Sequence, residues 1–194
     1  LFPYTTLFRS WNESMGEWIP APNRTVYHPV LWVAPLETNW EALGYDIENG
    51  DVKDVVKVAR ENLTIAVSGK VILYEETEKA TGFLILCPVI SSTNGEYRGL
   101  AAGVFQFNSL IHGTMGSIRD VNVAIFDLNN GDGSNGFIYS SLDESDQMYS
   151  EIAREIRRAK HKRYDDIVTV DRTYRVYFVA NNTFIERKTS YRKW

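Results

Sequence analysis

The sequence predicts an α+β fold made of two small units, and three observations support this prediction. Runs of β-branched and aromatic residues alternate with two stretches of helical periodicity. A strand–helix–strand pattern followed by antiparallel hairpins occurs about twice, and the boundary is expected near residues 108–120. The chain has 194 residues, of which 44% are hydrophobic and 24% charged, a composition typical of a globular protein that can bury a core.

The first half contains one well-defined helix among predicted strands. The apolar run 30–33 lies between two prolines and predicts a buried strand. After Asp51, apolar residues recur at helical spacing, so we expect a helix over residues 52–60 with Asp51 as its cap. A polar Asn-Gly loop at 91–96 predicts an antiparallel hairpin. The further strands of this half are expected at residues 65–67, 71–74, 83–90 and 100–107.

The second half repeats this alternation. A short helix is expected at residues 109–115, and a longer one at 144–160, where residues 148, 152, 156 and 159 lie on one face. The strands of this half are expected at residues 121–126, 137–139, 167–170 and 174–180.

The N-terminal decapeptide differs from the rest of the chain. Residues 1–10 resemble the in-frame translation of a sequencing adaptor. We therefore interpret them as an artefact fused to a truncated reading frame, and exclude them from the fold.

Composition and spacing disfavour several functions. The net charge is −4 and no basic block is present, so no nucleic-acid partner is expected. His28, His112 and His161 lack zinc-ligand spacing, and we expect no metal and no cofactor. The single cysteine, Cys87, lies in an apolar run and is expected to be a buried, inert thiol.

Support for catalysis is small. No nucleophile, phosphate-loop or metalloprotease motif is present, and the loop 127–136 lacks the order of a calcium site. Glu75, Glu76 and Glu78 form an acidic cluster that a secreted hydrolase could use, although such clusters usually face water. We therefore expect no enzyme activity in this chain.

The strongest local signal surrounds Asp46. Residues 27–39 form an apolar segment with two prolines and a final Asn, and a glycine-containing stretch then leads to Asp46. Gly44 permits close backbone approach, and a buried carboxylate is costly unless it is paired. Asp46 is therefore either a binding group or the cap of a turn or of the following helix.

Taken together, these segments resemble the CHASE family, the extracellular sensors of membrane histidine kinases, nucleotide cyclases and diguanylate cyclases. The similarity extends over about residues 11–141, and Ala34 departs from it, since the family often has an acidic residue there. The matching stretches are residues 16–20, 27–39, 43–46, 59–60, 82–89 and 99–107.

The resemblance implies two PAS-like subdomains with antiparallel sheets, normally preceded by a long N-terminal helix that is missing or truncated here. Residues 11–115 would form the membrane-distal, ligand-binding subdomain. Residues 116–194 would form the membrane-proximal subdomain, leading to a missing transmembrane helix. The chain would then be the extracytoplasmic part, periplasmic or extracellular, of a membrane-anchored receptor.

The resemblance also implies a ligand site. In plant cytokinin receptors of this family, a carboxylate at the position matching Asp46 hydrogen-bonds the adenine ring, so Asp46 is expected to bind an adenine-like or other small amphiphilic ligand. From the placement of apolar strands, we expect the walls of the pocket to come from Trp32, Ala66, Phe83, Leu84 and Phe105.

Two alternatives remain open. The domain would otherwise be a ligand-free dimerisation or structural module, or a secreted hydrolase that uses the cluster at Glu75. A homodimer is expected from the family resemblance alone.

Overall fold

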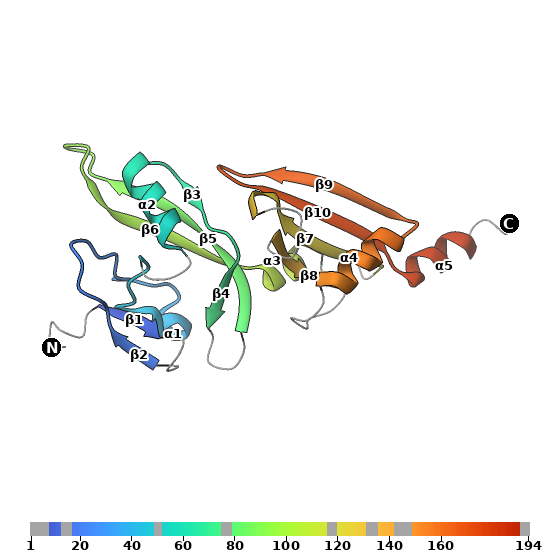
Figure 1. The fold of residues 1–194 in the computed structure, drawn as a ribbon, viewed down its shortest axis with the longest axis horizontal. Coiled ribbons are helices and arrows are strands. Elements are labelled where there is room, and N and C mark those ends of the chain that lie inside the picture. Colours follow the sequence, from blue (N-terminus) through green and yellow to red (C-terminus); the bar gives the residue numbers. More distant parts are fainter. Residues whose placement is uncertain are drawn as a thin grey trace. The chain divides into compact units, whose positions relative to one another are not determined.

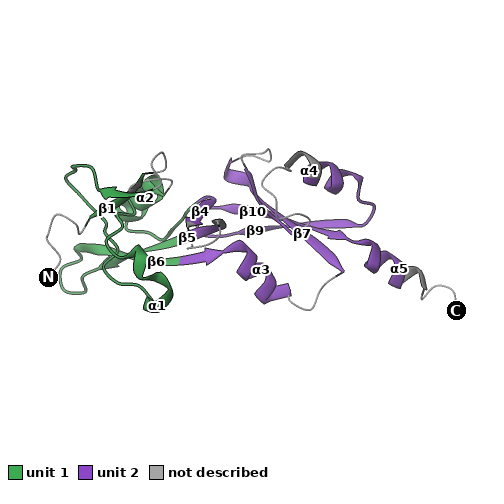
Figure 2. Ribbon diagram, turned by 90° about the horizontal axis from the view of Figure 1, so that it is seen from below, with its two compact units in different colours: residues 1–68, 85–103 green, residues 69–84, 104–194 purple. Residues whose placement is uncertain are grey.

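The computed structural model describes residues 8–12, 17–48, 52–74, 79–115, 120–130, 136–141 and 149–190. Helices and antiparallel sheets are mixed in it, which confirms the predicted α+β class (Figure 1). The chain divides into two compact units, residues 1–68 with 85–103 and residues 69–84 with 104–194 (Figure 2).

The first unit contains short elements and one regular helix. Its amphipathic helix α2 (Lys53–Asn62) follows the predicted periodicity, because Val56 and Ala59 are buried while Lys53 and Lys57 are exposed. Val52 occupies the N-cap position, and Asp51 lies outside the described residues. The other elements confined to this unit are β1 (Arg9–Asn12), β2 (Glu17–Pro20), α1 (Leu36–Asn39), η2 (Trp40–Ala42) and β3 (Ala66–Val67).

A long hairpin contributes residues to both units. Strands β5 (Lys79–Ile90) and β6 (Tyr97–Gln106) pair with each other, as predicted. At the turn, the Ser91 amide donates a hydrogen bond of 2.8 Å to the Glu96 carbonyl, and Gly95 adopts a φ of 70°. Strand β3 pairs with β5 in the first unit, and β4 (Val71–Tyr74) pairs with it in the second.

The second unit is built on a four-stranded antiparallel sheet. The strand order is β8–β7–β10–β9, and Tyr177 of β10 lies opposite Ala124 on one side and Tyr164 on the other. Its strands are β7 (Val121–Asp127), β8 (Phe137–Ser140), β9 (Lys162–Val168) and β10 (Thr173–Ala180). Its helical elements are α3 (Phe107–Met115), η3 (Leu128–Asn130), α4 (Tyr149–Arg158) and α5 (Asn182–Ser190).

Side chains on both faces of this sheet are buried, because successive residues of a strand point to opposite faces. Val123 and Ile125 of β7 pack on one face in a cluster with Phe107 of α3. Ala124 and Phe126 pack on the other face against α4, and the buried residues of this cluster are Ala124, Phe126, Ile152, Ile156 and Val179. The predicted helical face of residues 152 and 156 is therefore confirmed.

Three differences from the sequence-based expectations have local causes. Residues 30–33 form no strand, because Val30 bonds only to the 44–45 turn, and Trp32 is 79% exposed. Cys87 is exposed instead of buried, since it alternates along β5 with the buried Leu86. Residues 9–10, expected to lie outside the fold, pair with β2.

The compact units also divide the chain differently from the expected boundary after residue 115. Residues 69–84 and 104–115 belong to the second unit. They contain β4, the part of β5 that pairs with it, the end of β6, and α3. The origin of residues 1–10 and the PAS-like character of the units stay predictions.

Candidate functional site

Asp46 is the centre of a buried polar cluster in the first unit. Gly44 adopts a φ of 80°, and this left-handed turn brings residues 44–46 beside residues 28–30. Backbone bonds link the two segments, including one of 2.8 Å from the Val30 amide to the Tyr45 carbonyl. The Asp46 side chain is consequently fully buried.

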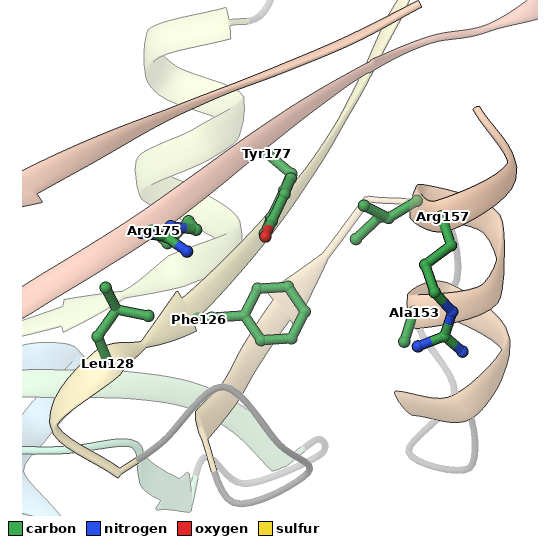
Figure 3. A pocket seen from close by; sticks show the side chains of 7 residues that line it. Phe126, Leu128, Ala153, Arg157, Arg175 and Tyr177 are labelled. Carbon is green, nitrogen blue, oxygen red and sulfur yellow. The ribbon is translucent and has the colours of Figure 1, made fainter. Parts of the chain in front are cut away.

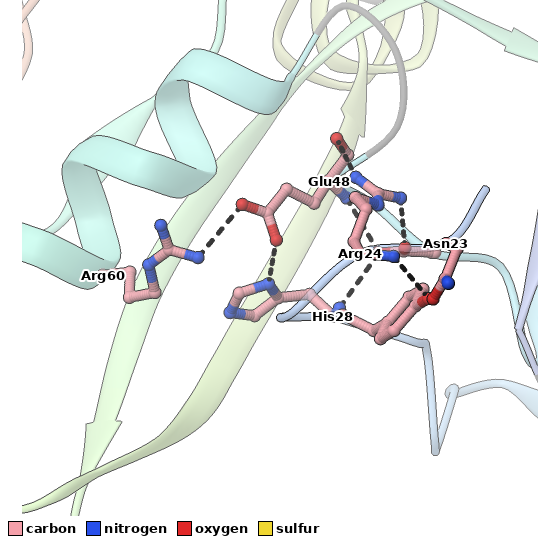
Figure 4. Close-up of polar contacts among 7 residues, drawn as sticks. Asn23, Arg24, His28, Glu48 and Arg60 are labelled. Carbon is pink, nitrogen blue, oxygen red and sulfur yellow. Dashed lines mark hydrogen bonds and ion pairs between the residues drawn. The ribbon is translucent and has the colours of Figure 1, made fainter. Parts of the chain in front are cut away.

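Three donors bind the Asp46 carboxylate. They come from Arg24, His28 and Glu48, which are labelled in Figure 4. Its Oδ1 accepts hydrogen bonds from the backbone amides of His28, at 2.9 Å, and Glu48, at 3.2 Å. Its Oδ2 forms an ion pair with the Arg24 guanidinium. Both oxygens are thus satisfied by the chain, and the charge is compensated, as a buried carboxylate requires.

Glu48 extends the cluster to helix α2. Its Oε2 lies 2.9 Å from Nδ1 of His28, and its Oε1 accepts a bond of 3.0 Å from Arg60 of α2. The expectation that His28 is a satisfied histidine is confirmed. Asp46 is therefore connected to α2 through the backbone amides of His28 and Glu48, which it binds, and through the Glu48 side chain, which binds Arg60.

Two polar atoms of this cluster remain without a hydrogen-bond partner among the described residues: the hydroxyl oxygen of Tyr97 and Nε of Arg24, both buried. The Tyr97 ring lies edge-on to His28, with 5.9 Å between the ring centroids. Burial raises the pKa of the Tyr97 phenol, Arg60 lowers it, and Glu48 raises it further. These atoms are available to bond a bound molecule.

The second unit contains a matching buried carboxylate. Asp127 is 1% exposed, and its Oδ2 lies 2.5 Å from the Arg172 guanidinium. Its Oδ1 accepts a bond of 3.0 Å from the amide of Asn129, two residues along the chain, as Asp46 does from Glu48. Substitution of Asp127 therefore provides an internal control for the loss of stability that the removal of a buried, arginine-paired carboxylate causes.

A pocket of about 220 Å³ lies in the second unit, between helix α4 and the sheet (Figure 3). Arg175 at its wall is held by Asp166 through two bonds of 2.8 and 2.9 Å. Its lining residues are Phe126, Leu128, Ala153, Ile156, Arg157, Arg175 and Tyr177. Apolar side chains and two guanidinium groups thus form its wall.

Comparison with protein families gives one decisive result. The family model described as the CHASE domain matches residues 6–158 of the 194-residue chain, well over half of its length. The chain belongs to the CHASE domain family. A comparison with curated proteins found no match. The predicted family is thereby confirmed, and the chain is a sensory signalling domain of the extracellular type, not a catalytic domain.

The residues predicted to bind ligand are divided between the two units of this CHASE domain. Asp46 and Ala66 are fully buried in the first unit, whereas Trp32 in that unit is 79% exposed. Phe83, Leu84 and Phe105 belong to the second unit. There Phe83 stacks on Phe105 at 5.2 Å and contacts Phe107 and Tyr174, so its ring is part of the aromatic packing of that unit. Their role as pocket walls stays a prediction.

Sequence reasoning missed the charged residues around Asp46. Arg24, Glu48 and Arg60 come from three separate segments, and no spacing rule links them. One signal could have indicated that the segments at residues 27–30 and 43–46 belong to one site: both lie within the stretches that resemble the CHASE family.

Other expectations can be compared with the described part of this CHASE domain. Within it, no group of three or more His, Cys, Asp or Glu side chains could hold a metal ion. None of the helices in the described ranges is long and apolar enough to cross a membrane. The acidic cluster at residues 75–78 lies outside the described residues, and with it the site of the hydrolase alternative.

Proposed function

We propose that this CHASE domain is the extracytoplasmic small-molecule sensor of a membrane-anchored receptor, and that its ligand binds in the first unit at Asp46. The observation that carries the proposal is the fully buried Asp46 carboxylate, whose charged partner among the described residues is Arg24, from a segment without helix or strand. Catalysis, by a histidine kinase or a cyclase, would belong to another part of the parent receptor.

The contacts of Arg24 indicate the chemistry of the ligand. A guanidinium group is planar and presents several N–H donors at its edge. An adenine-type heterocycle with an exocyclic amine offers N–H donors in a similar plane, so it can replace Arg24 at Oδ2 of Asp46. The buried Tyr97 hydroxyl would supply a further hydrogen bond.

The same exchange provides a signalling step. Release of Arg24 would free the segment around residues 21–28, and the Glu48 bonds to His28 and Arg60 would transmit the change to α2. A ligand that favours the released arrangement shifts the equilibrium between the two arrangements. Arg24 acts in this scheme as an internal competitor of the ligand.

Thermal unfolding of the full chain with adenine-type compounds tests the proposal. Ligand at 100 times its dissociation constant adds about 2.7 kcal/mol to the free energy of unfolding. For a chain of this size, that raises Tm by roughly 5–10 °C. We expect Asp46→Asn to abolish the shift, because the negatively charged acceptor is lost.

Two further variants separate binding from stability. Asp127→Asn removes the matching carboxylate of the second unit and should keep the ligand-induced shift. Arg24→Gln removes the internal competitor and should lower the ligand concentration needed for half the shift. A shift that survives in Asp46→Asn contradicts the site, and the absence of any shift in the wild-type chain favours the ligand-free dimerisation module.

A further inference from the structure

Strand β9 forms an edge of the sheet in the second unit. In the described part of the chain it pairs with β10 on one side, and it ends the strand order β8–β7–β10–β9 (Figure 1). All seven of its residues, Lys162–Val168, are exposed. A long open edge is a template for pairing with another strand, and proteins usually cover or block it.

The direction of the backbone groups follows from two hydrogen bonds at the ends of the β9–β10 ladder. The Thr169 amide donates to the Arg172 carbonyl at 2.8 Å, and the Ala180 amide donates to the His161 carbonyl at 3.0 Å. Odd-numbered residues of this ladder therefore bond toward β10, because antiparallel pairing alternates along a strand. The amides and carbonyls of residues 162, 164 and 166 consequently face the open edge.

The charges of β9 are self-complementary. In an antiparallel pair of two β9 strands centred on Tyr164, Lys162 lies opposite Asp166 and Arg163 lies opposite Asp165. Each pairing occurs twice because of the twofold symmetry. The same register makes residues 162, 164 and 166 the hydrogen-bonded positions, which are the ones whose backbone groups face outward.

Neighbouring registers are less favourable. A shift of the centre to Arg163 places two arginines directly opposite each other, and a shift to Asp165 places two aspartates opposite each other. A centre between two residues would pair the outward groups of one strand with the inward groups of the other. Hydrogen bonding thus excludes the centres between two residues, and charge favours Tyr164 over Arg163 and Asp165 as the centre.

We propose that β9 pairs antiparallel with β9 of a second copy of this chain, around a twofold axis at Tyr164. Arg163 and Asp165 are 79% and 57% exposed and form an ion pair of 3.3 Å with each other within the strand, and pairing across the axis would replace this exposed contact. Lys162 is held by the carbonyls of Ile156 and Arg157, and Asp166 is held by Arg175, so the pair of Lys162 with Asp166 contributes less. Two four-stranded sheets would then join into one of about eight strands. This inference does not depend on the ligand at Asp46.

Charge exchange tests the register by sedimentation velocity of the full chain across a concentration series. Arg163→Asp places like charges opposite each other twice, so we expect the dimer dissociation constant to rise about tenfold or more. Asp165→Arg should do the same. The double variant restores opposite charges and should restore the dimer.

The two single variants also complement each other. A mixture of Arg163→Asp with Asp165→Arg should form a heterodimer that is tighter than either homodimer, because every pair across the axis then has opposite signs. A matched control is Arg98→Asp, which alters an exposed ion pair of the same spacing between Arg98 of β6 and Glu96, the residue before this strand. Dimerisation of the control should equal that of the wild-type chain.

A disulfide gives a second measurement that is independent of charge. Facing residues at a hydrogen-bonded position have Cα atoms about 5.5 Å apart, within the range of a disulfide. In a Cys87→Ser background, Tyr164→Cys should therefore crosslink two copies, and Arg163→Cys should crosslink far less. A wild-type chain that stays monomeric at all concentrations, or single charge variants that dimerise like the wild type, would overturn the proposal.

Discussion

The substitution of Gly82 by alanine tests how closely the strands of the second unit approach each other. A Cβ atom at Gly82 would lie 2.3 Å from the carbonyl oxygen of Phe105 and 2.7 Å from Cδ1 of Leu73. The Leu73 side chain can rotate, but the Phe105 carbonyl belongs to the backbone of β6. That strand would have to move by roughly 1 Å to restore an ordinary contact.

Overpacking of this kind reduces the free energy of unfolding by about 1–3 kcal/mol. For a chain of this length, we expect Gly82→Ala to lower Tm by roughly 2–12 °C in scanning calorimetry. The matched control is Gly113→Ala in helix α3, where a Cβ meets nothing within 4 Å. Alanine is favoured over glycine in a helix by about 1 kcal/mol, so this variant should raise Tm.

The two glycines belong to the same unit, so both variants report on the same unfolding transition. Opposite signs of the Tm change would agree with the close approach at Gly82. A Tm of Gly82→Ala equal to that of the wild-type chain would refute the reasoning, because it would mean that β6 does not lie against this position.

Two further predictions concern single side chains. Val56→Ala on helix α2 removes a fully buried side chain and should reduce the free energy of unfolding by about 2 kcal/mol in urea titration, whereas Val58→Ala, 41% exposed on the same helix, should change it by less than about 0.5 kcal/mol. Burial raises the pKa of Tyr174 from 10.0 to about 12, so between these pH values the unfolded chain loses this proton before the folded chain does. Stability should therefore fall as the pH rises through this window, and urea titration at pH 9 and pH 11.5 should show a smaller fall in Tyr174→Phe. An equal fall in both proteins would contradict the assignment.

Elements with a clear local period were predicted well. Helix α2 and the β5–β6 hairpin follow from apolar spacing and from the polar Asn-Gly loop, and both depend on contacts near in sequence. Residues 30–33 have strand-like composition but form no strand, because β-structure needs a partner strand and only isolated bonds to residues 44–45 are present. Strand propensity alone could not supply that information.

For the candidate site, too, some features followed from the sequence and others required the tertiary structure. The sequence alone identified the family, the segment ending at Asp46, and the two possible roles of its carboxylate. Only the tertiary structure showed that Arg24 and two backbone amides surround it, and that Glu48 connects it to α2. The physical reason is that a buried charge must be compensated by groups close in space, and folding brings those groups together from segments that are distant in the sequence.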